Sequence, residues 1–355
     1  MAKGKLALGL DIGSSSVKMV LLKESKRGFE LAHFGIAPIP SEAIVDGALM
    51  NSTAIVQAIQ ELVAAQKIKH KEVALGVAGH SVIIKKIQLP VMSQEQLDEA
   101  IAFEAEQYIP FDIKDVNIDT QILTPPGDEA DGVMDVLLVA VKKDMINDYT
   151  SVIAEAGLTP TIVDVDAFAV QNAYETAYGI PPGETVVLIN AGASVVNINI
   201  LANGITSFTR DITLGGNLFT EEIQKQLNVS HDEAEALKVG GSAGGDADAV
   251  VPQEVERVIQ GVAEQMAGEI QRSLDFYAAT AADGRISRVL LSGGTARIPA
   301  LQRTIAQRCG VPVEILNPFR NIEIDHRRFD PKYILEVAPM AAVAVGLGLR
   351  KPHDK

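Results

Sequence analysis

The chain opens with three apolar segments whose lengths and separations predict a three-stranded antiparallel meander. They span about 5–11, 17–23 and 29–37, and the polar turns GSSS and ESKRG separate them. Short apolar runs bounded by Gly and Ser clusters are typical of strands joined by hairpins. Apolar residues then recur at helical spacing between Asn51 and Lys67, and the strand-like run VALGV follows. This opening stretch is therefore predicted to form a βββαβ unit.

The pattern changes after the first unit. The apolar run 82–90 leads to Ser93 and Gln96, which stand three residues apart as in a capping box and predict the start of a helix. Two more strands, 116–124 and 133–142, precede a helix that is expected to end near Gly157. We predict a small α+β insertion here.

The second half repeats the opening of the chain. When TVVLINAGAS is aligned on LALGLDIGSS, Gly192 falls on Gly13 and Asn190 on Asp11, at the same offset. A meander that returns once, half a chain later, indicates two related domains rather than a solenoid. A long helix to about Thr280, a strand ending at 292 and a final helix then follow. We expect an α/β protein with duplicated domains and an α+β insertion. The expected parts are 1–81 with about 160–180 and a C-terminal helix 336–350, the inserted part 82–159, the part 181–215 with 285–335, and the part 216–284.

Composition narrows the class of function. The chain of 355 residues is 47% hydrophobic and carries a net charge of −15, which argues against a binder of nucleic-acid backbones. Cys309 is the one cysteine, and the histidines do not fall in metal-ligand spacing with it. The N-terminus lacks an apolar stretch of signal-peptide length, and the apolar segment 338–349 is too short to cross a bilayer. We expect a cytoplasmic protein.

Two turns carry the candidate chemistry. The turn around Gly13 joins a carboxylate, Asp11, to three serines, and it could be an ordinary hairpin in which Gly13 supplies a positive φ. Its recurrence at Gly192 favours a second interpretation, two turns that face each other across a cleft and bind a polyphosphate with backbone N–H groups and hydroxyls. Lys18 would add a charge for the phosphates, and Asp11 would hold Mg²⁺ through water. The glycines before Thr295 would let the chain approach a purine.

The segments LGLDIGSSSVK, LINAGAS and LSGGTARIPAL resemble, in order and spacing, the phosphate and adenosine loops of the superfamily of actin, heat-shock ATPases and sugar kinases. The insertion, together with EAEQYIPFDIKDVNID and VDVDAFAVQNAYE, is similar to the type IV pilus assembly protein PilM family, a relative of the cell-division protein FtsA. The resemblance implies an actin-like fold with ribonuclease-H-like domains. It also implies an ATP-binding scaffold with Mg²⁺ that binds the cytoplasmic tail of the inner-membrane pilus protein PilN, together with other pilus assembly components. It would reach the inner face of the membrane only through such partners, and it could self-associate.

The resemblance also assigns roles to residues of this chain. Phosphates and Mg²⁺ would be held by the first turn, the opposing loop would come from the second turn, and the remaining residues would border the nucleoside. For Glu235 and Lys238 a solvated ion pair is an equal alternative. The cofactor-binding residues so implied are Asp11, Gly13, Ser14, Ser15, Ser16, Lys18, Asn190, Gly192, Ala193, Gly215, Gly216, Asn217, Glu235, Lys238, Gly293, Gly294, Thr295 and Ile298.

The chain departs from the family pattern at Asn190, where an Asp is usual, and at Val195 or Val196, where a Thr or Ser is often found. An amide cannot accept a proton from water, so a general-base contribution of roughly 10²- to 10⁴-fold would be absent. We therefore expect nucleotide binding with slow hydrolysis and name no catalytic residue.

Two other functions stay open at this stage. A small-molecule kinase would need a carboxylate base, for which Asp164 or Asp166 is available, although a strand end and a helix cap would explain both. An FtsA-like filament protein would be expected to carry a C-terminal amphipathic helix, and the polar tail RKPHDK does not resemble one. A peptide groove would be lined by Phe103, Tyr108 and Ile109, for which core packing is the alternative.

Overall fold

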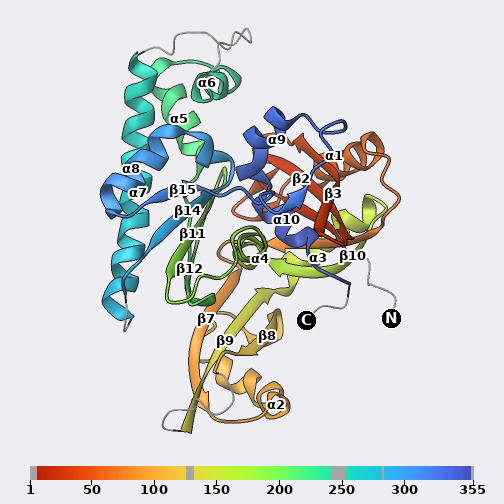
Figure 1. Cartoon of the computed structure of the whole chain (residues 1–355), viewed down its shortest axis with the longest axis vertical. Coiled ribbons are helices and arrows are strands. Elements are labelled where there is room, and N and C mark those ends of the chain that lie inside the picture. Colours follow the sequence, from red (N-terminus) through yellow and green to blue (C-terminus); the bar gives the residue numbers. More distant parts are fainter. Residues whose placement is uncertain (1–5, 125–131, 241–252, 282–283, 353–355) are drawn as a thin grey trace.

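Figure 1 shows the chain as a computed structural model, which describes residues 6–124, 132–240, 253–281 and 284–352. Two mixed sheets lie side by side in it, and a third, smaller sheet extends away from them. The first sheet takes all but one of its strands from the first half of the chain, and the second takes its strands from the second half. The boundaries of the four predicted parts stay predictions.

The first sheet has six strands in the order β10-β6-β1-β2-β3-β16. The predicted meander forms its centre, because β1 pairs antiparallel with β2 and β2 pairs antiparallel with β3. On its other side β1 pairs parallel with β6, which pairs parallel with β10. The strands are β1 (Leu8–Ile12), β2 (Ser16–Ser25), β3 (Gly28–Pro38), β6 (Glu72–Val77), β10 (Thr159–Val165) and β16 (Ile322–Glu323).

The second sheet repeats this arrangement in the order β13-β12-β11-β14-β15. Here β11 pairs antiparallel with β12 and parallel with β14, as β1 does with β2 and β6. The duplication predicted from the two glycine turns is therefore confirmed at the level of strand order. The strands are β11 (Thr185–Ala191), β12 (Val196–Ala202), β13 (Ile205–Ile212), β14 (Arg288–Ser292) and β15 (Val313–Ile315).

Helices α4 (Asp166–Tyr178) and α10 (Ala342–Gly348) contact each other and the first sheet. Small residues allow this contact: a Cβ on Gly346 would lie 1.7 Å from the carbonyl oxygen of Ala169, and one on Gly9 would lie 2.1 Å from that of Ala344. Helices α1 (Ser52–Ala65) and α3 (Lys143–Glu155) bury apolar residues in the main core of the first half. The close approach of α4 fixes the start of that helix beside the strand ends.

The insertion is a sheet of order β7-β9-β8, covered by α2. Its core is separate and contains Leu97 and Ile101 of α2. The predicted capping box is confirmed, because Ser93 and Gln96 bond to each other's backbone N–H. The elements are β7 (Val82–Pro90), α2 (Gln94–Ala105), β8 (Val116–Ile122) and β9 (Val133–Lys142).

The described part of the second half carries four further helices, of which two contact its sheet and two pack on the longest helix (Figure 1). The longest is predicted correctly and contributes Met266 and Ile270 to the core. They are α5 (Gly216–Leu227), α6 (His231–Lys238), α7 (Gln253–Thr280) and α8 (Pro299–Cys309). Helix α5 begins directly behind the second turn, so it aims its N-terminus at that turn.

The single C-terminal helix predicted for 336–350 is wrong. The chain forms α9 (Pro331–Val337), a 3-10 turn (Ala338–Ala341) and then α10. Pro339 has no N–H to continue the α-helical pattern, and its carbonyl oxygen accepts the backbone N–H of Gly293 at 2.8 Å. The short hairpin of β4 (Ile44–Val45) and β5 (Ala48–Leu49) is not predicted from the sequence either. Within the described residues, no helix combines the length and apolarity needed to cross a membrane.

Candidate functional site

The first turn joins β1 to β2 and is closed by a hydrogen bond from the Gly13 N–H to the Ser16 carbonyl, at 3.2 Å. Asp11 and Lys18 stand opposite each other on the two strands, and their Oδ2 and Nζ atoms are 3.3 Å apart. A Cβ on Gly13 would lie 2.9 Å from that Nζ, so the glycine leaves room for the ammonium group. Gly13 does not adopt a positive φ, and the hairpin explanation based on one is wrong.

The second turn has the same closure, from the Gly192 N–H to the Val195 carbonyl at 2.9 Å. The start of α5 packs onto it: the N–H of Gly216 donates to the Gly192 carbonyl, and that of Asn217 donates to the Ala193 carbonyl. This packing brings the backbone at the start of α5 into direct contact with the backbone of the second turn. The first N–H groups of α5 thereby hold the second turn in place.

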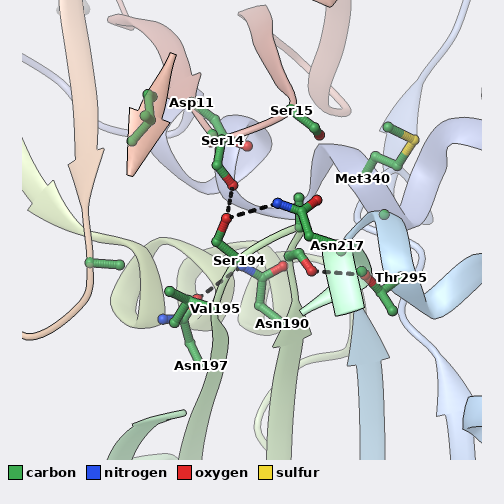
Figure 2. Close-up of a pocket in the computed structure, with 18 of the residues that line it drawn as sticks. Asp11, Ser14, Ser15, Asn190, Ser194, Val195, Asn197, Asn217, Thr295 and Met340 are labelled. Carbon is green, nitrogen blue, oxygen red and sulfur yellow. Dashed lines mark hydrogen bonds between the residues drawn. The ribbon is translucent and has the colours of Figure 1, made fainter. Parts of the chain in front are cut away.

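The two turns meet tip to tip. Figure 2 shows the hydroxyl groups of Ser14 and Ser194 in direct contact, with a hydrogen bond of 2.8 Å between them. The side chain of Asn217 reaches the same Ser194 hydroxyl at 3.4 Å. Serine and asparagine side chains can turn their donors toward an anion, so this meeting point has the chemistry of a phosphate site.

A cleft of about 770 Å³ lies between the halves at this point and is open to solvent. Ser16 and Gly215 do not line it. Ser16 is buried, with a hydroxyl that has no hydrogen-bond partner among the described residues, and a Cβ on Gly215 would lie 2.3 Å from the Ala193 carbonyl oxygen. The other residues implied by the resemblance do line it: Asp11, Gly13, Ser14, Ser15, Lys18, Asn190, Gly192, Ala193, Gly216, Asn217, Glu235, Lys238, Gly293, Gly294, Thr295 and Ile298.

Asp166 is a cleft residue that the sequence interpretation favoured as a helix cap. Val165 holds the cap position of α4, and Asp166 is the first helical residue and lines the cleft. A Cβ on Gly76 would lie 2.1 Å from its Oδ1, so the strand end makes room for this carboxyl. Burial, then the charges of Asp11 and Asp211, raise the pKa of Asp166 well above its usual value. Asp166 is therefore a carboxyl group with a raised pKa at the wall of the cleft.

Asp164 has a different, structural environment. It accepts the N–H of Val165 at 2.8 Å and pairs with Arg350 at 2.5 Å, which ties β10 to the chain after α10. Burial raises the pKa of Asp164 in spite of the arginine. Of the two carboxylates named as candidate bases, Asp166 therefore lines the cleft and Asp164 makes a structural ion pair.

A polar row crosses the second sheet beneath the turns. Asn190, Asn197 and Asp211 stand opposite one another on β11, β12 and β13. Asn190 donates to Asn197 at 3.1 Å, and Asn197 donates to Asp211 at 2.8 Å. The other oxygen of Asp211 accepts the backbone N–H of Gly79, from the first half, at 2.7 Å. The row therefore ends at a contact between the two halves.

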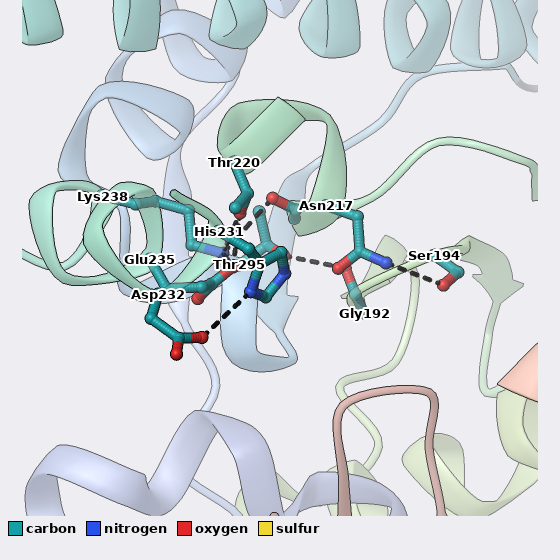
Figure 3. Close-up of polar contacts among 10 residues, drawn as sticks. Gly192, Ser194, Asn217, Thr220, His231, Asp232, Glu235, Lys238 and Thr295 are labelled. Carbon is teal, nitrogen blue, oxygen red and sulfur yellow. Dashed lines mark hydrogen bonds and ion pairs between the residues drawn. The ribbon is translucent and has the colours of Figure 1, made fainter. Parts of the chain in front are cut away.

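The far end of the cleft is built on α5 and α6. Figure 3 shows Lys238 beside Glu235 and Thr220, with its Nζ 2.5 Å from the glutamate and 2.9 Å from the threonine hydroxyl. The Thr220 hydroxyl also donates to Glu235. The Lys238 side chain is only 12% exposed, so this is not the freely solvated pair offered as the alternative. Thr295 bonds to the Gly192 carbonyl at 2.8 Å and joins this end to the second turn.

The sequence did not single out several cleft residues. Ser194 had a signal, because the repeat places it on Ser15, but Asn197 and Asp211 are recognised only from their neighbours in space. In the part of the chain that the structure describes, no group of three or more His, Cys, Asp and Glu side chains is arranged to hold a metal ion directly. Mg²⁺ held by Asp11 through water stays a prediction.

The proposed peptide groove is only partly supported by burial. Ile109 is 6% exposed and belongs to the core of the insertion, and Tyr108 packs against that core. Phe103, on the outer side of α2, is 74% exposed. Core packing, the alternative, therefore applies to the first two residues but not to Phe103.

Comparison with known proteins places the chain among actin-like proteins. It is 28% identical to a chain of a solved PilM-PilN type IV pilus biogenesis complex, with a TM-score of 0.87 and coverage of 98% of this chain and 99% of that one. The ethanolamine utilization protein EutJ from Carboxydothermus hydrogenoformans has a TM-score of 0.58 at 16% identity, over 98% of this chain and 90% of that one. It shares the fold alone.

Curated relatives are cell division proteins FtsA. That of Neisseria meningitidis serogroup B is 27% identical over 87% of this chain and 75% of its own length. The family model described as "Type IV pilus assembly protein PilM" matches residues 9–352, nearly the whole chain. With the duplicated sheets and the facing turns already described, this coverage establishes that the chain belongs to the type IV pilus assembly protein PilM family.

Proposed function

We propose that this protein is an ATP-binding scaffold of type IV pilus assembly that hydrolyses ATP slowly and binds the cytoplasmic tail of a PilN-type inner-membrane protein. The observation that carries the nucleotide part is the contact between the Ser14 and Ser194 hydroxyls, which brings the two turns to one spot at the cleft. A polyphosphate at this spot would be shared by both halves of the chain.

The residues present suit a magnesium nucleotide. The serines, the backbone N–H groups of the turns and Lys18 are donors for phosphate oxygens, and Asp11 is an acceptor for the waters that Mg²⁺ keeps. Glu235 and Lys238, which line the cleft and are held by Thr220, provide polar partners for a ribose. The nucleotide would supply a polyanion that bridges the halves, and the chain would orient it and neutralise its charge.

Slow hydrolysis follows from the chemistry at Asn190. This residue lines the cleft where the repeat places the counterpart of Asp11, and its amide cannot act as a base. Asp166 remains as a carboxyl group in the cleft, and burial, then the charge of Asp11, raises its pKa. The amide of Asn190 therefore supports binding over turnover.

The test has two arms. Isothermal titration of nucleotide-free protein with Mg-ATP should give saturable heat, and chromatography of the recovered nucleotide after hours should return mostly ATP. Fluorescence anisotropy with a labelled PilN N-terminal peptide should show binding, and a scrambled peptide of the same composition should not bind. Absence of heat with Mg-ATP would refute the nucleotide part, and equal binding of both peptides would refute the scaffold part.

A second candidate function, a small-molecule kinase, is supported by the position of Asp166 in the cleft. A carboxylate in the cleft is what a small-molecule kinase of this fold would need. Sugars and polyols should not stimulate ATP consumption if the scaffold proposal is right. A stimulated rate that Asp166→Asn abolishes would favour the kinase.

A further inference from the structure

The polar row from Asn190 to Asp211 has only one possible direction of hydrogen bonding. Burial raises the pKa of Asp211, but its two oxygens accept hydrogen bonds from the Asn197 NH₂ group at 2.8 Å and the Gly79 N–H at 2.7 Å, which opposes the burial effect and sets the orientation of Asn197. The carbonyl oxygen of Asn197 then faces Asn190 and can only accept, so Asn190 must turn its own NH₂ group toward it, at 3.1 Å. The side-chain orientation of Asn190 is therefore decided by the carboxyl group of a residue two strands away.

This orientation determines what Asn190 presents to the cleft. One N–H of its nitrogen is committed to Asn197, which fixes the side of the amide on which the carbonyl oxygen lies and leaves that oxygen as the acceptor for a ligand. Figure 2 shows Asn190 below Ser194, between the contact to Asn197 and the middle of the pocket. A carbonyl oxygen repels phosphate oxygens but accepts hydrogen bonds from water, and Mg²⁺ keeps several of its waters when it binds with phosphates.

We propose that Asp211 is a positioning residue that acts through Asn197, so that Asn190 presents its carbonyl oxygen to the cleft and accepts a hydrogen bond from a water of the Mg²⁺ hydration shell. This inference rests on the proposed nucleotide function and deepens it. Asn190 is then not merely a carboxylate lost from the second turn. It is an oriented acceptor for the hydrated cation, and it adds no negative charge beside Asp11 and Asp166.

The Gly79 contact links this arrangement to closure of the cleft. Asp211 accepts Asn197 with one oxygen and the Gly79 N–H of the first half with the other, at 2.7 Å. Both oxygens are thus occupied by donors from opposite sides of the cleft. The carboxyl group that orients Asn190 is therefore the same group that joins the two halves at Gly79.

The experiment measures how much Mg²⁺ tightens binding of a fluorescent ATP analogue, as the ratio of Kd in EDTA to Kd with Mg²⁺. Asn197→Ala removes the middle of the row without changing charge, and it should lower this ratio about fivefold, as loss of a hydrogen bond would. Its Kd in EDTA should change less than twofold. Asn190→Ala should have the same effect, and the double variant should lose no more than either single variant.

Two further variants separate orientation from charge and from misfolding. Asp211→Asn, at a position open to the cleft, should lower the ratio in the unchanged protein but not in the Asn190→Ala background. Asp275→Asn, the same change at an exposed position of α7, should leave the ratio unchanged. The thermal midpoint of each nucleotide-free variant checks its folding, and Asn197→Ser replaces Asn197→Ala if the latter unfolds.

An unchanged ratio in folded Asn197→Ala or Asn197→Ser would overturn the inference while leaving the proposed function intact. An equal effect of Asp211→Asn with and without Asn190 would also overturn it, because the carboxylate would then act by its own charge. If the unchanged protein does not bind the analogue at all, the proposed function fails, and the inference fails with it.

Discussion

Replacing Asn190 by aspartate would exchange a hydrogen-bond donor for an acceptor beside the Asn197 carbonyl oxygen, at a separation of 3.1 Å. Asn197 cannot simply turn its amide around, because its NH₂ group is held by Asp211 at 2.8 Å. The new carboxylate would also add negative charge to a cleft that Asp11 lines. Losing one hydrogen bond and opposing two acceptors costs about 1–3 kcal/mol. The nucleotide-free variant should therefore melt about 2–6 °C below the unchanged protein.

The same substitution restores a group that can accept a proton from water. General-base catalysis contributes roughly 10²- to 10⁴-fold, or about 3–5 kcal/mol of barrier. We expect the lower end, about 10²-fold, because the row holds position 190 for an amide and not for a base. The hydrolysis rate is measured as phosphate release in a single turnover, with the protein in excess over Mg-ATP. A fluorescence melt gives the stability.

The control is Asn147→Asp, which makes the same chemical change at an exposed position of α3. It should alter neither the rate nor the melting temperature. If Asn190→Asp binds Mg-ATP normally but releases phosphate no faster, the missing base does not limit hydrolysis. If the unchanged protein already turns over as fast as active actin-like ATPases, the argument from Asn190 is wrong from the outset.

Three further predictions concern stability, pH and the partner. Gly293→Ala should destabilise the protein by about 2 kcal/mol or more in a chemical unfolding experiment, because Gly293 has φ +89° and a Cβ would lie 2.2 Å from the Ala191 carbonyl oxygen. Gly294→Ala, whose Cβ would meet only the Met340 side chain at 3.9 Å, should change stability by less than about 1 kcal/mol. Asp166→Asn should raise the melting temperature of nucleotide-free protein at neutral pH by about 2 °C or more, because the raised pKa of Asp166 means that its charged form destabilises the fold. This gain in melting temperature should shrink as the pH falls below the pKa of the folded state toward 4. A gain that grows on acidification would contradict the prediction. Phe103→Ser should weaken binding of the PilN peptide about tenfold without lowering the melting temperature. Phe276→Ser, at a side chain that is also more than half exposed, should change neither the peptide affinity nor the melting temperature. Equal peptide affinity in both variants would exclude Phe103 from the groove.

The duplicated core could be predicted from the sequence because it is encoded locally. Apolar runs broken by Gly and Ser mark the hairpins, and the repeat of Gly13 at Gly192 marks the second sheet. The capping box at Ser93 likewise lies within a few residues of chain. Signals of this kind require no knowledge of distant contacts.

The parts that were missed depend on contacts between distant segments. The C-terminal helix is broken around Pro339 because its carbonyl oxygen accepts the Gly293 N–H, from a loop that the pattern of Ala and Gly residues does not reveal. Asp166 reads as a helix cap in sequence and becomes a cleft residue only because Gly76 of a neighbouring strand leaves it room. Asp211 has no local sequence signal, because its place in the site depends on hydrogen bonds to Asn197 and Gly79, which lie on other segments of the chain.

An apolar cluster joins the two halves beside α4, but at the cleft itself the described residues meet through polar contacts, which bears on why a scaffold would retain a nucleotide. The Ser14 hydroxyl meets that of Ser194, and Asp211 meets the Gly79 N–H. Each such hydrogen bond contributes only about 0.5–1.5 kcal/mol net. A ligand that touches both turns adds binding energy to the closed arrangement, about 2.7 kcal/mol at a concentration one hundred times its Kd. Since that gain is lost each time the ligand is cleaved and released, a second turn that carries an amide in place of a base favours a lasting closed form. If the proposed nucleotide binding is right, the chain would use its nucleotide to hold the two halves closed.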